Sequence, residues 1–152
     1  MRTVELGEVA EVIRGITFSK SDVSNDPVPG YLPILRAGNI SDVLNFIDDL
    51  VFVPQSYVEG PQLLRRGDIV MCTSSGSASV VGKSAIVDRD WNGSFGAFCA
   101  TIRPNPNKVN SSYLANFLKD KRFRNWASTR AVQRYLLKVI ENMDLRPPRA
   151  AA

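Results

Sequence analysis

The stretch that decides the fold is residues 64–104, LRRGDIVMCTSSGSASVVGKSAIVDRDWNGSFGAFCATIRP. Three runs within it are rich in Ile, Val, Met, Phe and Thr, which suit a pleated, half-buried surface: residues 68–72, 83–87 and 96–102. Between the first two runs lies the Ser/Gly loop, residues 74–79, with the sequence SSGSAS. The stretch therefore predicts a sheet that carries a short, hydroxyl-rich loop at its rim, where binding residues are often found.

The Ser/Gly loop does not predict a nucleotide-binding site. A Walker A motif has four residues between its first glycine and Gly-Lys-Ser/Thr, and it lies between a strand and a helix. Here five residues separate Gly76 from Gly82, and the residues after Lys83 are β-branched and short rather than helical. The two glycines are instead typical of tight turns.

The composition is that of one globular domain. The chain has 152 residues, of which 44% are hydrophobic and 22% charged. No apolar run approaches the ~20 residues of a membrane span, and the N-terminus lacks the hydrophobic segment of a signal peptide. We expect a cytoplasmic protein with a single domain at residues 1–148 and a tail at 149–152. Cys72 and Cys99 lie in strand-like runs, which predicts buried free thiols.

The chain contains no histidine. This excludes Ser-His-Asp and Cys-His nucleophile systems and histidine-ligated metals, and two cysteines alone cannot form a structural zinc site. Serine-lysine chemistry stays formally open through Ser74, Ser75 and Lys83, although serines in such loops are typical of turns. We therefore expect no catalytic activity of its own, no cofactor and no metal.

The charge is unevenly distributed along the chain. Residues 1–118 hold ten Lys and Arg against twelve Asp and Glu, whereas residues 119–152 hold nine against three. A basic final quarter on a mildly acidic body indicates an anionic partner, with nucleic acid as the first candidate. A solvated helix face would give the same pattern.

The remaining segments predict an α+β fold. Residues 6–14 fit one helical turn followed by a short strand, and residues 16–30 form a long polar loop. Residues 31–40 and 50–53 read as strands, and Pro33 places the first of these at a sheet edge or at its start. An N-cap cluster at 110–112 precedes an amphipathic helix over 110–127. We expect a strongly twisted, mostly antiparallel β core with this C-terminal helix packed on it.

Several short motifs occur in a characteristic order over residues 4–148. They are Leu6-Gly7-Glu8-Val9 with Gly15 and Ser19-Lys20, then residues 33–36, 63–70 and the Ser/Gly loop, then 81–87, Gly96, Tyr113-Leu114, Phe117-Leu118 and Phe123-Arg124. Their order and spacing resemble the target recognition domain of the DNA specificity subunit of type I restriction-modification systems. The resemblance implies a non-catalytic domain that reads one half of a bipartite target in double-stranded DNA.

The resemblance also implies partners. Full specificity subunits of this kind typically carry a second such domain and long helices that dock methyltransferase (modification) subunits, in a complex with restriction subunits. No methyltransferase motif is visible, because Asn105-Pro106-Asn107 lacks the proline-aromatic continuation that grips a flipped base.

Candidate DNA-binding residues follow from the chemistry of base edges, which are read by hydrogen-bonding side chains on stiff elements. Such side chains occur at strand ends and in the Ser/Gly loop, namely at Arg36, Asn39, Ser41, Ser74, Ser75, Ser77, Ser79 and Lys83. The first loop offers Arg14, Thr17, Ser19 and Lys20. The basic final quarter offers phosphate contacts through Arg122, Arg124, Arg130, Gln133 and Arg134.

Two other functions remain open. The basic final quarter could bind an acidic surface of another protein. The domain could also bind RNA, although RNA-binding proteins commonly present aromatic side chains for stacking, and here Phe and Trp fall at core-like spacings.

Overall fold

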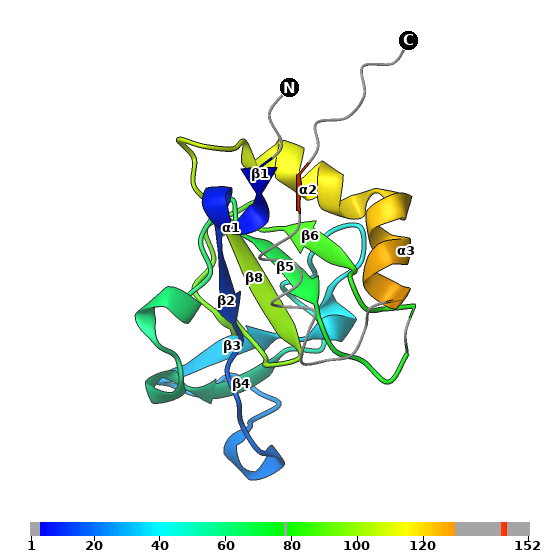
Figure 1. Cartoon of the computed structure of the whole chain (residues 1–152). Coiled ribbons are helices and arrows are strands. Elements are labelled where there is room, and N and C mark those ends of the chain that lie inside the picture. Colours follow the sequence, from blue (N-terminus) through cyan, green and yellow to red (C-terminus); the bar gives the residue numbers. More distant parts are fainter. Residues whose placement is uncertain (1–3, 78, 130–143, 146–152) are drawn as a thin grey trace.

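The computed structural model describes residues 4–77, 79–129 and 144–145 (Figure 1). Its centre is an antiparallel sheet of four strands, in the order β2 (Ala10–Arg14), β8 (Cys99–Pro104), β5 (Ile69–Cys72) and β6 (Ser84–Ile86). A second sheet has the order β4 (Val51–Pro54), β3 (Tyr31–Leu35) and β7 (Ser94–Phe95). A third, two-stranded sheet pairs β1 (Val4–Glu5) with β9 (Asp144–Leu145). The predicted α+β fold with a mostly antiparallel core is confirmed.

The second sheet contains the exception to antiparallel pairing, because β3 runs parallel to β7. The expectation that Pro33 lies on an edge strand or at the start of its strand is wrong, since β3 is the middle strand of its sheet and Pro33 lies in the middle of β3. Pro33 is tolerated there because it pairs with Phe52 on β4, whereas the pairing with β7 begins at Ile34. Proline lacks an N–H, so it fits where one side of the strand makes no ladder bond.

The helices are short. They are α1 (Leu6–Val9), α2 (Ser111–Lys119) and α3 (Lys121–Thr129), with 3-10 turns η1 (Lys20–Asp22), η2 (Ala37–Asn39), η3 (Gln55–Tyr57) and η4 (Gly60–Gln62). The helical turn followed by a strand within residues 6–14 is confirmed. Nowhere in the described part of the chain is a helix long and apolar enough to cross a membrane.

The single helix expected over residues 110–127 is wrong, because it is divided at Asp120, which has an extended backbone with ψ 139°. The Asp120 carboxylate accepts a hydrogen bond from the backbone N–H of Arg122 at 2.8 Å, as an N-cap does. The start of α2 is as predicted, since Asn110 Oδ1 accepts from the backbone N–H of Tyr113 at 3.0 Å. Capping chemistry therefore sets both helix starts.

One face of the central sheet packs against the helices. Ile69, Met71 and Ile102 from the strands meet Leu114 and Leu118 from α2, and all five are buried. In Figure 1, α2 lies above β6, and α3 follows it at the right. The apolar face of the predicted helix is thus its packing face.

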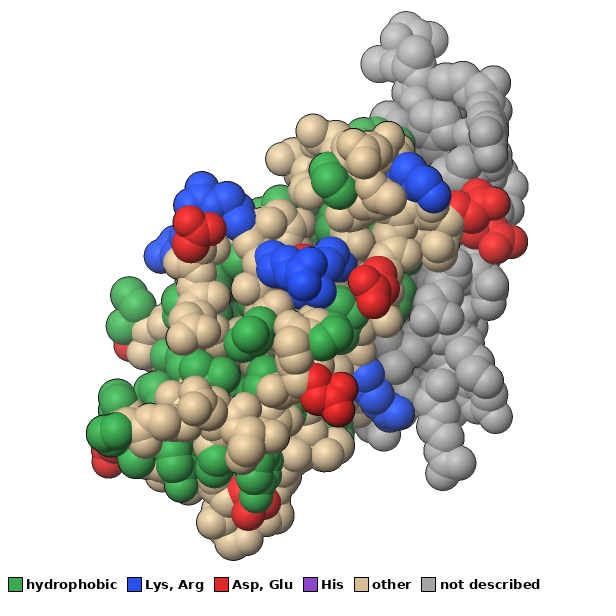
Figure 2. Space-filling view, turned by 90° about the vertical axis from the view of Figure 1, so that its left-hand side faces the viewer, with side chains coloured by type: hydrophobic (Ala, Val, Ile, Leu, Met, Phe, Trp, Pro, Cys, Tyr) green, Lys and Arg blue, Asp and Glu red, His purple; other side chains and the backbone are tan. Residues whose placement is uncertain are grey.

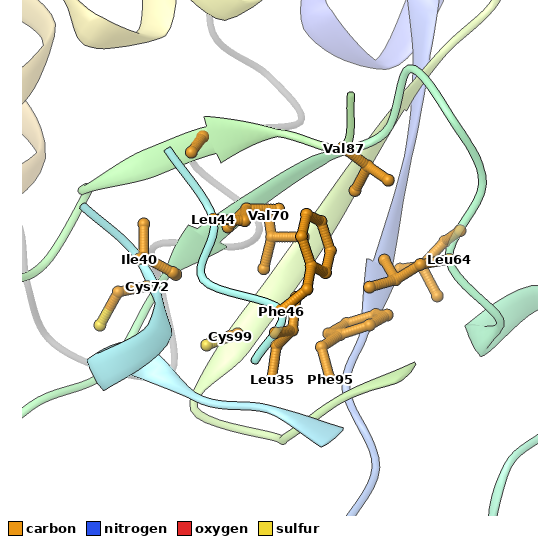
Figure 3. Packing of buried hydrophobic residues seen from close by; sticks show 12 residues of the cluster. Leu35, Ile40, Leu44, Phe46, Leu64, Val70, Cys72, Val87, Phe95 and Cys99 are labelled. Atoms are coloured by element: carbon orange, nitrogen blue, oxygen red, sulfur yellow. The ribbon is translucent and has the colours of Figure 1, made fainter. Parts of the chain in front are cut away.

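The other face of the sheet packs against residues 35–46 and against Phe95, the last residue of β7. Figure 3 shows this cluster, in which Val70, Cys72 and Cys99 from the sheet lie near Ile40 and Phe95. Cys72 and Cys99 are paired across β5 and β8. Both thiols are free and buried, as predicted.

These thiols are expected to resist alkylation in the folded protein. Burial raises the pKa of Cys72, and it raises the pKa of Cys99 to about 12. At pH 8 iodoacetamide should therefore label neither residue until denaturant is added, when both should react, as mass spectrometry would show. Because the unfolded thiols ionise at lower pH than the folded ones, this burial should also lower stability as the pH rises toward 12. Rapid labelling without denaturant would contradict the packing.

A buried ion pair lies at the end of the central sheet where β8 ends and β5 begins. The Arg103 guanidinium donates to both carboxylate oxygens of Asp68 at 2.9 Å. It also donates to the carbonyl oxygens of Pro61 at 3.0 Å and Leu63 at 2.9 Å. Asp68 in turn accepts from the backbone N–H of Arg65 at 2.8 Å. The side chains are 2% and 11% exposed for Asp68 and Arg103, so the network joins β8 to the turn before β5 inside the protein.

Candidate functional site

Several polar residues lie at the other end of the central sheet. Arg14 pairs with Ala100, Ala100 with Met71, and Met71 with Ser84, so these residues form one row across the four strands. Because neighbouring strands are antiparallel, β2 and β5 end here while β8 and β6 begin here. We call this edge the rim and define it as residues 14–17, 72–75, 82–83 and 96–99. It brings together Arg14, Thr17, Ser74, Ser75 and Lys83 of the predicted set.

The connection from β5 to β6 is fixed to the rim at both ends. The backbone N–H groups of Thr73 and Ser74 donate to the Phe98 carbonyl at 2.9 and 3.2 Å. At the other end, Gly82 donates to the Cys72 carbonyl at 2.7 Å and has a positive φ of 88°. The predicted tight turn at Gly82 is therefore confirmed, since glycine adopts this conformation readily. Gly76 is not among the residues with a positive φ.

The tip of the Ser/Gly loop is exposed. Ser77 and Ser79 lie on the surface, with their hydroxyl groups 2.9 Å apart, and the Ser77 backbone N–H donates to Ser75 Oγ at 3.1 Å. Ser75 is half-buried, and Ser74 is buried. The hydroxyls of Ser75, Ser77 and Ser79 are therefore the accessible ones in this loop.

Phe98 is a rim residue that the sequence did not reveal. Residues 96–102 look like one strand, but β8 begins at Cys99, and Cys99 N–H donates to the Gly96 carbonyl at 2.9 Å in a tight turn. This turn leaves the Phe98 ring 69% exposed. Its carbonyl also accepts from Thr73 Oγ1 at 3.3 Å, so the ring projects from a fixed backbone. The small residues Gly96 and Ala97 before it were the available signal.

The rim also joins the two sheets. Ile16 forms a parallel bridge with Gly96, and the Gly96 N–H donates to the Leu35 carbonyl at 2.9 Å. This contact requires a glycine at position 15, because a Cβ there would overlap the Gly96 carbonyl and lie 2.8 Å from the Phe95 oxygen. The end of β3 is thereby placed beside the rim.

Arg36 follows β3 and is exposed next to the rim. Its Nη2 donates to the carbonyl of Asp49 at 3.1 Å, and Asp49 has a positive φ of 53°. Arg36 and Asp49 both line an open depression of about 430 Å³. The other lining residues are Asn25, Pro27, Ile47, Leu50 and Phe52.

The expected role of Asn39 in reading bases requires correction, because Asn39 is only 3% exposed. Its amide nitrogen donates to the carbonyls of Asn45 at 3.2 Å and Asp48 at 2.8 Å, and its oxygen accepts from Arg36 N–H at 2.9 Å. All of its polar atoms thus hold the loop after β3. Ser74 is likewise buried, so neither side chain is available at the surface.

Other predicted residues lie away from the rim. Ser19 Oγ donates to Asp22 Oδ2 at 2.8 Å beside Lys20 in η1, and Ser24 N–H, 2.9 Å from the Phe52 carbonyl, holds this loop on β4. Hydrogen bonds from Ser19 keep the pKa of Asp22 below its ordinary value. Ser41 is exposed. It lies near the end of α2, since Lys119 Nζ donates to the carbonyl of the neighbouring Asp42.

The five candidate DNA-binding residues of the final quarter divide into two that lie in the described part of the chain and three that lie outside it. Arg122 is 87% exposed and pairs with Asp120 at 3.2 Å. Arg124 is half-buried, and its Nη2 donates to the Ser79 carbonyl at 2.9 Å. Arg130, Gln133 and Arg134 lie outside the described residues.

The charge on the described surface is mixed. Figure 2 shows the face seen from the left of Figure 1, where Lys and Arg side chains are scattered and acidic side chains lie beside several of them. Hydrophobic side chains gather over the lower part of this face, where β3 and β4 lie. No three His, Cys, Asp or Glu side chains of the described ranges could hold a metal ion together.

Known proteins resemble this chain in sequence. Residues 1–139 match the family model described as "Type I restriction modification DNA specificity domain". The specificity subunit of the type I restriction enzyme StySPI from Salmonella potsdam is 42% identical over 127 residues, which are 84% of this chain and 27% of that protein. The EcoKI specificity subunit of Escherichia coli strain K12 is 42% identical over 121 residues, which are 80% of this chain and 26% of that protein. The chain thus spans about a quarter of these relatives.

Solved structures share the fold. The HsdS subunit from Thermoanaerobacter tengcongensis superposes with a TM-score of 0.70 at 19% identity, covering 94% of this chain and 32% of that one. A chain from a structure that describes complex assembly and conformational transition of the type I R-M system gives 0.67 at 17% identity, covering 95% and 33%.

Proposed function

The chain belongs to the family of type I restriction modification DNA specificity domains, and we propose that it reads one half of a two-part target in double-stranded DNA. Specificity subunits are the non-catalytic components of type I restriction-modification systems. In this proposal the chain acts together with methyltransferase and restriction subunits and with a second specificity domain, which reads the other half of the target.

The observation that carries this proposal is the rim. Arg14 ends β2 and Thr17 follows it, while Ser75 follows β5 and Lys83 precedes β6. Because these strands are paired in one sheet, the four residues lie at the same end of it. Side chains on stiff elements can keep a fixed spacing against base edges, which direct reading of sequence requires. Flexible surface residues could bind DNA through charge, but they would not discriminate between sequences.

Within this proposal the residues have separate roles. Arg14, Thr17, Arg36 and Lys83, together with the exposed serines of the Ser/Gly loop, contact base edges. Phe98 joins them, because an apolar side chain can contact the methyl group of thymine in the major groove. Arg122, which is exposed, contacts phosphate, and Ser19, Lys20 and Ser41 are peripheral. Arg130, Gln133 and Arg134 keep their proposed phosphate contacts.

The exposed ring of Phe98 also favours a second candidate function. Aromatic side chains on a sheet stack on unpaired bases in many RNA-binding and single-strand-binding proteins. A competition between duplex and single-stranded oligonucleotides of the same sequence distinguishes the two candidates. Preferential binding of the single strand would replace the duplex proposal with this one.

The direct test is a titration of the 152-residue chain with fluorescent duplexes of random sequence at two salt concentrations. Because one half-site offers little surface, we expect weak binding, nearer the non-specific range of about 10⁻⁴–10⁻⁶ M than nanomolar. Binding should fall steeply with salt, since phosphate contacts release counterions. If no duplex is bound even at low salt, the isolated chain does not read DNA.

Variants should separate the two kinds of contact. Replacing Arg122 by Ala should weaken binding to all duplexes alike and reduce the slope of log K against log salt by about one. Replacing Arg36, Ser75 or Ser77 by Ala should reduce discrimination by roughly 1–3 kcal/mol per lost base contact while leaving the slope nearly unchanged. Selection from a pool of random duplexes, followed by sequencing, measures the discrimination between sequences. Salt titration measures the slope. Equal loss of sequence preference in both groups would contradict this division.

A further inference from the structure

The tip of the Ser/Gly loop is tethered by a hydrogen bond from a residue outside the loop. The two ends of the loop are held by the rim, through the carbonyls of Phe98 and Cys72. Between them, Ser75, Ser77 and Ser79 bond to one another. Among the described residues, the bond that ties this tip to another element is that from Arg124 Nη2 to the Ser79 carbonyl, at 2.9 Å.

Arg124 is well placed to act as a rigid support. It lies in the first turn of α3, where its backbone N–H donates to the Asp120 carbonyl at 3.0 Å. The preceding residue, Phe123, is buried in the core cluster beneath α2. The start of α3, which carries Arg124, is therefore anchored in the core by Phe123 and capped by Asp120.

The side chain of Arg124 is less accessible than that of Arg122, because Arg124 is half-buried. Its Nε is buried and has no hydrogen-bond partner among the described residues, while Nη2 reaches the loop. Arg122, two residues earlier, is 87% exposed and bonds locally to Asp120. A phosphate contact needs an accessible cation, so the two arginines have different surroundings and are suited to different roles.

We propose that Arg124 is a positioning residue that holds the tip of the Ser/Gly loop in register for reading bases, and that it does not contact phosphate. This inference rests on the proposed function of the loop, and it corrects the expectation that groups Arg124 with Arg122. The acceptor on the loop is a backbone carbonyl. The side chains at positions 77 and 79 can therefore change, and with them the sequence that is read, without loss of the tether.

The tether itself can be tested without DNA. A Ser77→Cys variant labelled with a fluorophore reports motion of the tip, because Cys72 and Cys99 are buried and should not react. In this background Arg124→Met should increase the nanosecond mobility of the probe in anisotropy decay, and Arg124→Lys should give an intermediate result. Arg122→Met is the matched control and should leave the probe unchanged. Equal mobility in all four proteins would overturn the tether.

The role in reading is tested with unlabelled proteins that keep Ser77. Arg124→Met should reduce the ratio of affinities between preferred and random duplexes by up to roughly tenfold, as expected for loss of a hydrogen bond from a charged donor. The salt slope should stay unchanged, whereas Arg122→Met should lower it by about one. If Arg124→Met does not fold, as thermal melting would show, the Arg124→Lys variant supplies the comparison.

Two outcomes would overturn the proposal in different ways. A lower salt slope with intact sequence preference in Arg124→Met would make Arg124 a phosphate contact. A mobilised tip in a chain that binds no duplex would support the tether but refute its role in reading, together with the proposed function.

Discussion

Replacing Arg103 with methionine is expected to lower the free energy of unfolding by about 3–5 kcal/mol, because it leaves the Asp68 carboxylate buried without its partner. Asp68 is 2% exposed, so water cannot replace the two hydrogen bonds that are lost. The carbonyls of Pro61 and Leu63 lose their donors as well. Urea denaturation monitored by tryptophan fluorescence would measure the loss. A change within the error of the wild type would show that the pair is not buried in solution.

Two controls separate burial of the pair from loss of a charge. The ion pair of Arg66 with Asp90 is exposed on both sides, so Arg66→Met should change stability little. Replacing Asp68 and Arg103 together with Leu and Met should recover part of the loss, because neither charge is then left buried alone. Failure of the double variant to recover any stability would point to the turn at residues 61–65 as the source of the loss.

Gly15→Ala is expected to destabilise the protein by roughly 3 kcal/mol or more, at the upper end of the cost of overpacking. The added methyl group would overlap the Gly96 carbonyl, which is backbone and cannot move aside as a flexible side chain can. Relief would require the two sheets to separate where Ile16 meets Gly96. Thermal melting of the variant gives the size of the effect.

Gly60→Ala is the matched control, since a Cβ at position 60 meets no atom within 4 Å and Gly60 does not have a positive φ. It should melt close to the wild type. The Gly15→Ala variant should also lose discrimination between duplexes if it folds. The contact that the methyl group would displace fixes the backbone between Arg14 and Thr17. A variant that keeps both stability and discrimination would contradict the close approach of the two sheets.

Local patterns predicted much of this fold from sequence. The runs of β-branched residues around the Ser/Gly loop became β5, β6 and β8, because such side chains need the buried surfaces that a sheet provides. Asn110 predicted the start of α2 through a hydrogen bond that spans three residues. The burial of Cys72 and Cys99 followed from the apolar runs that contain them. In each case the signal is a pattern of a few neighbouring residues, which can be recognised without knowing what the segment packs against.

Several features that the sequence did not reveal depend on interactions between distant segments. Asn39 looks like an exposed polar residue in sequence, yet the loop after β3 folds back so that its carbonyls enclose the amide. Arg124 fits a basic helix face until its contact with Ser79, 45 residues earlier, is known. Phe98 is indistinguishable from a strand residue until the turn before β8 is placed. The arrangement of the proposed site therefore required the three-dimensional structure, whereas the positions of most strands in the sequence did not.

The position of β8 in the sheet has a consequence for how the chain is made. β8 lies between β2 and β5 and pairs with both, with Ala10 opposite Pro104. A ribosome releases the chain N-terminus first, so β2 and β5 emerge well before the strand that joins them. Folding of such distant partners is slow, and unpaired strand edges can associate with other chains meanwhile. The sheet and its rim can therefore form only after synthesis has passed β8, and until then the nascent domain exposes the unpaired edges of β2 and β5.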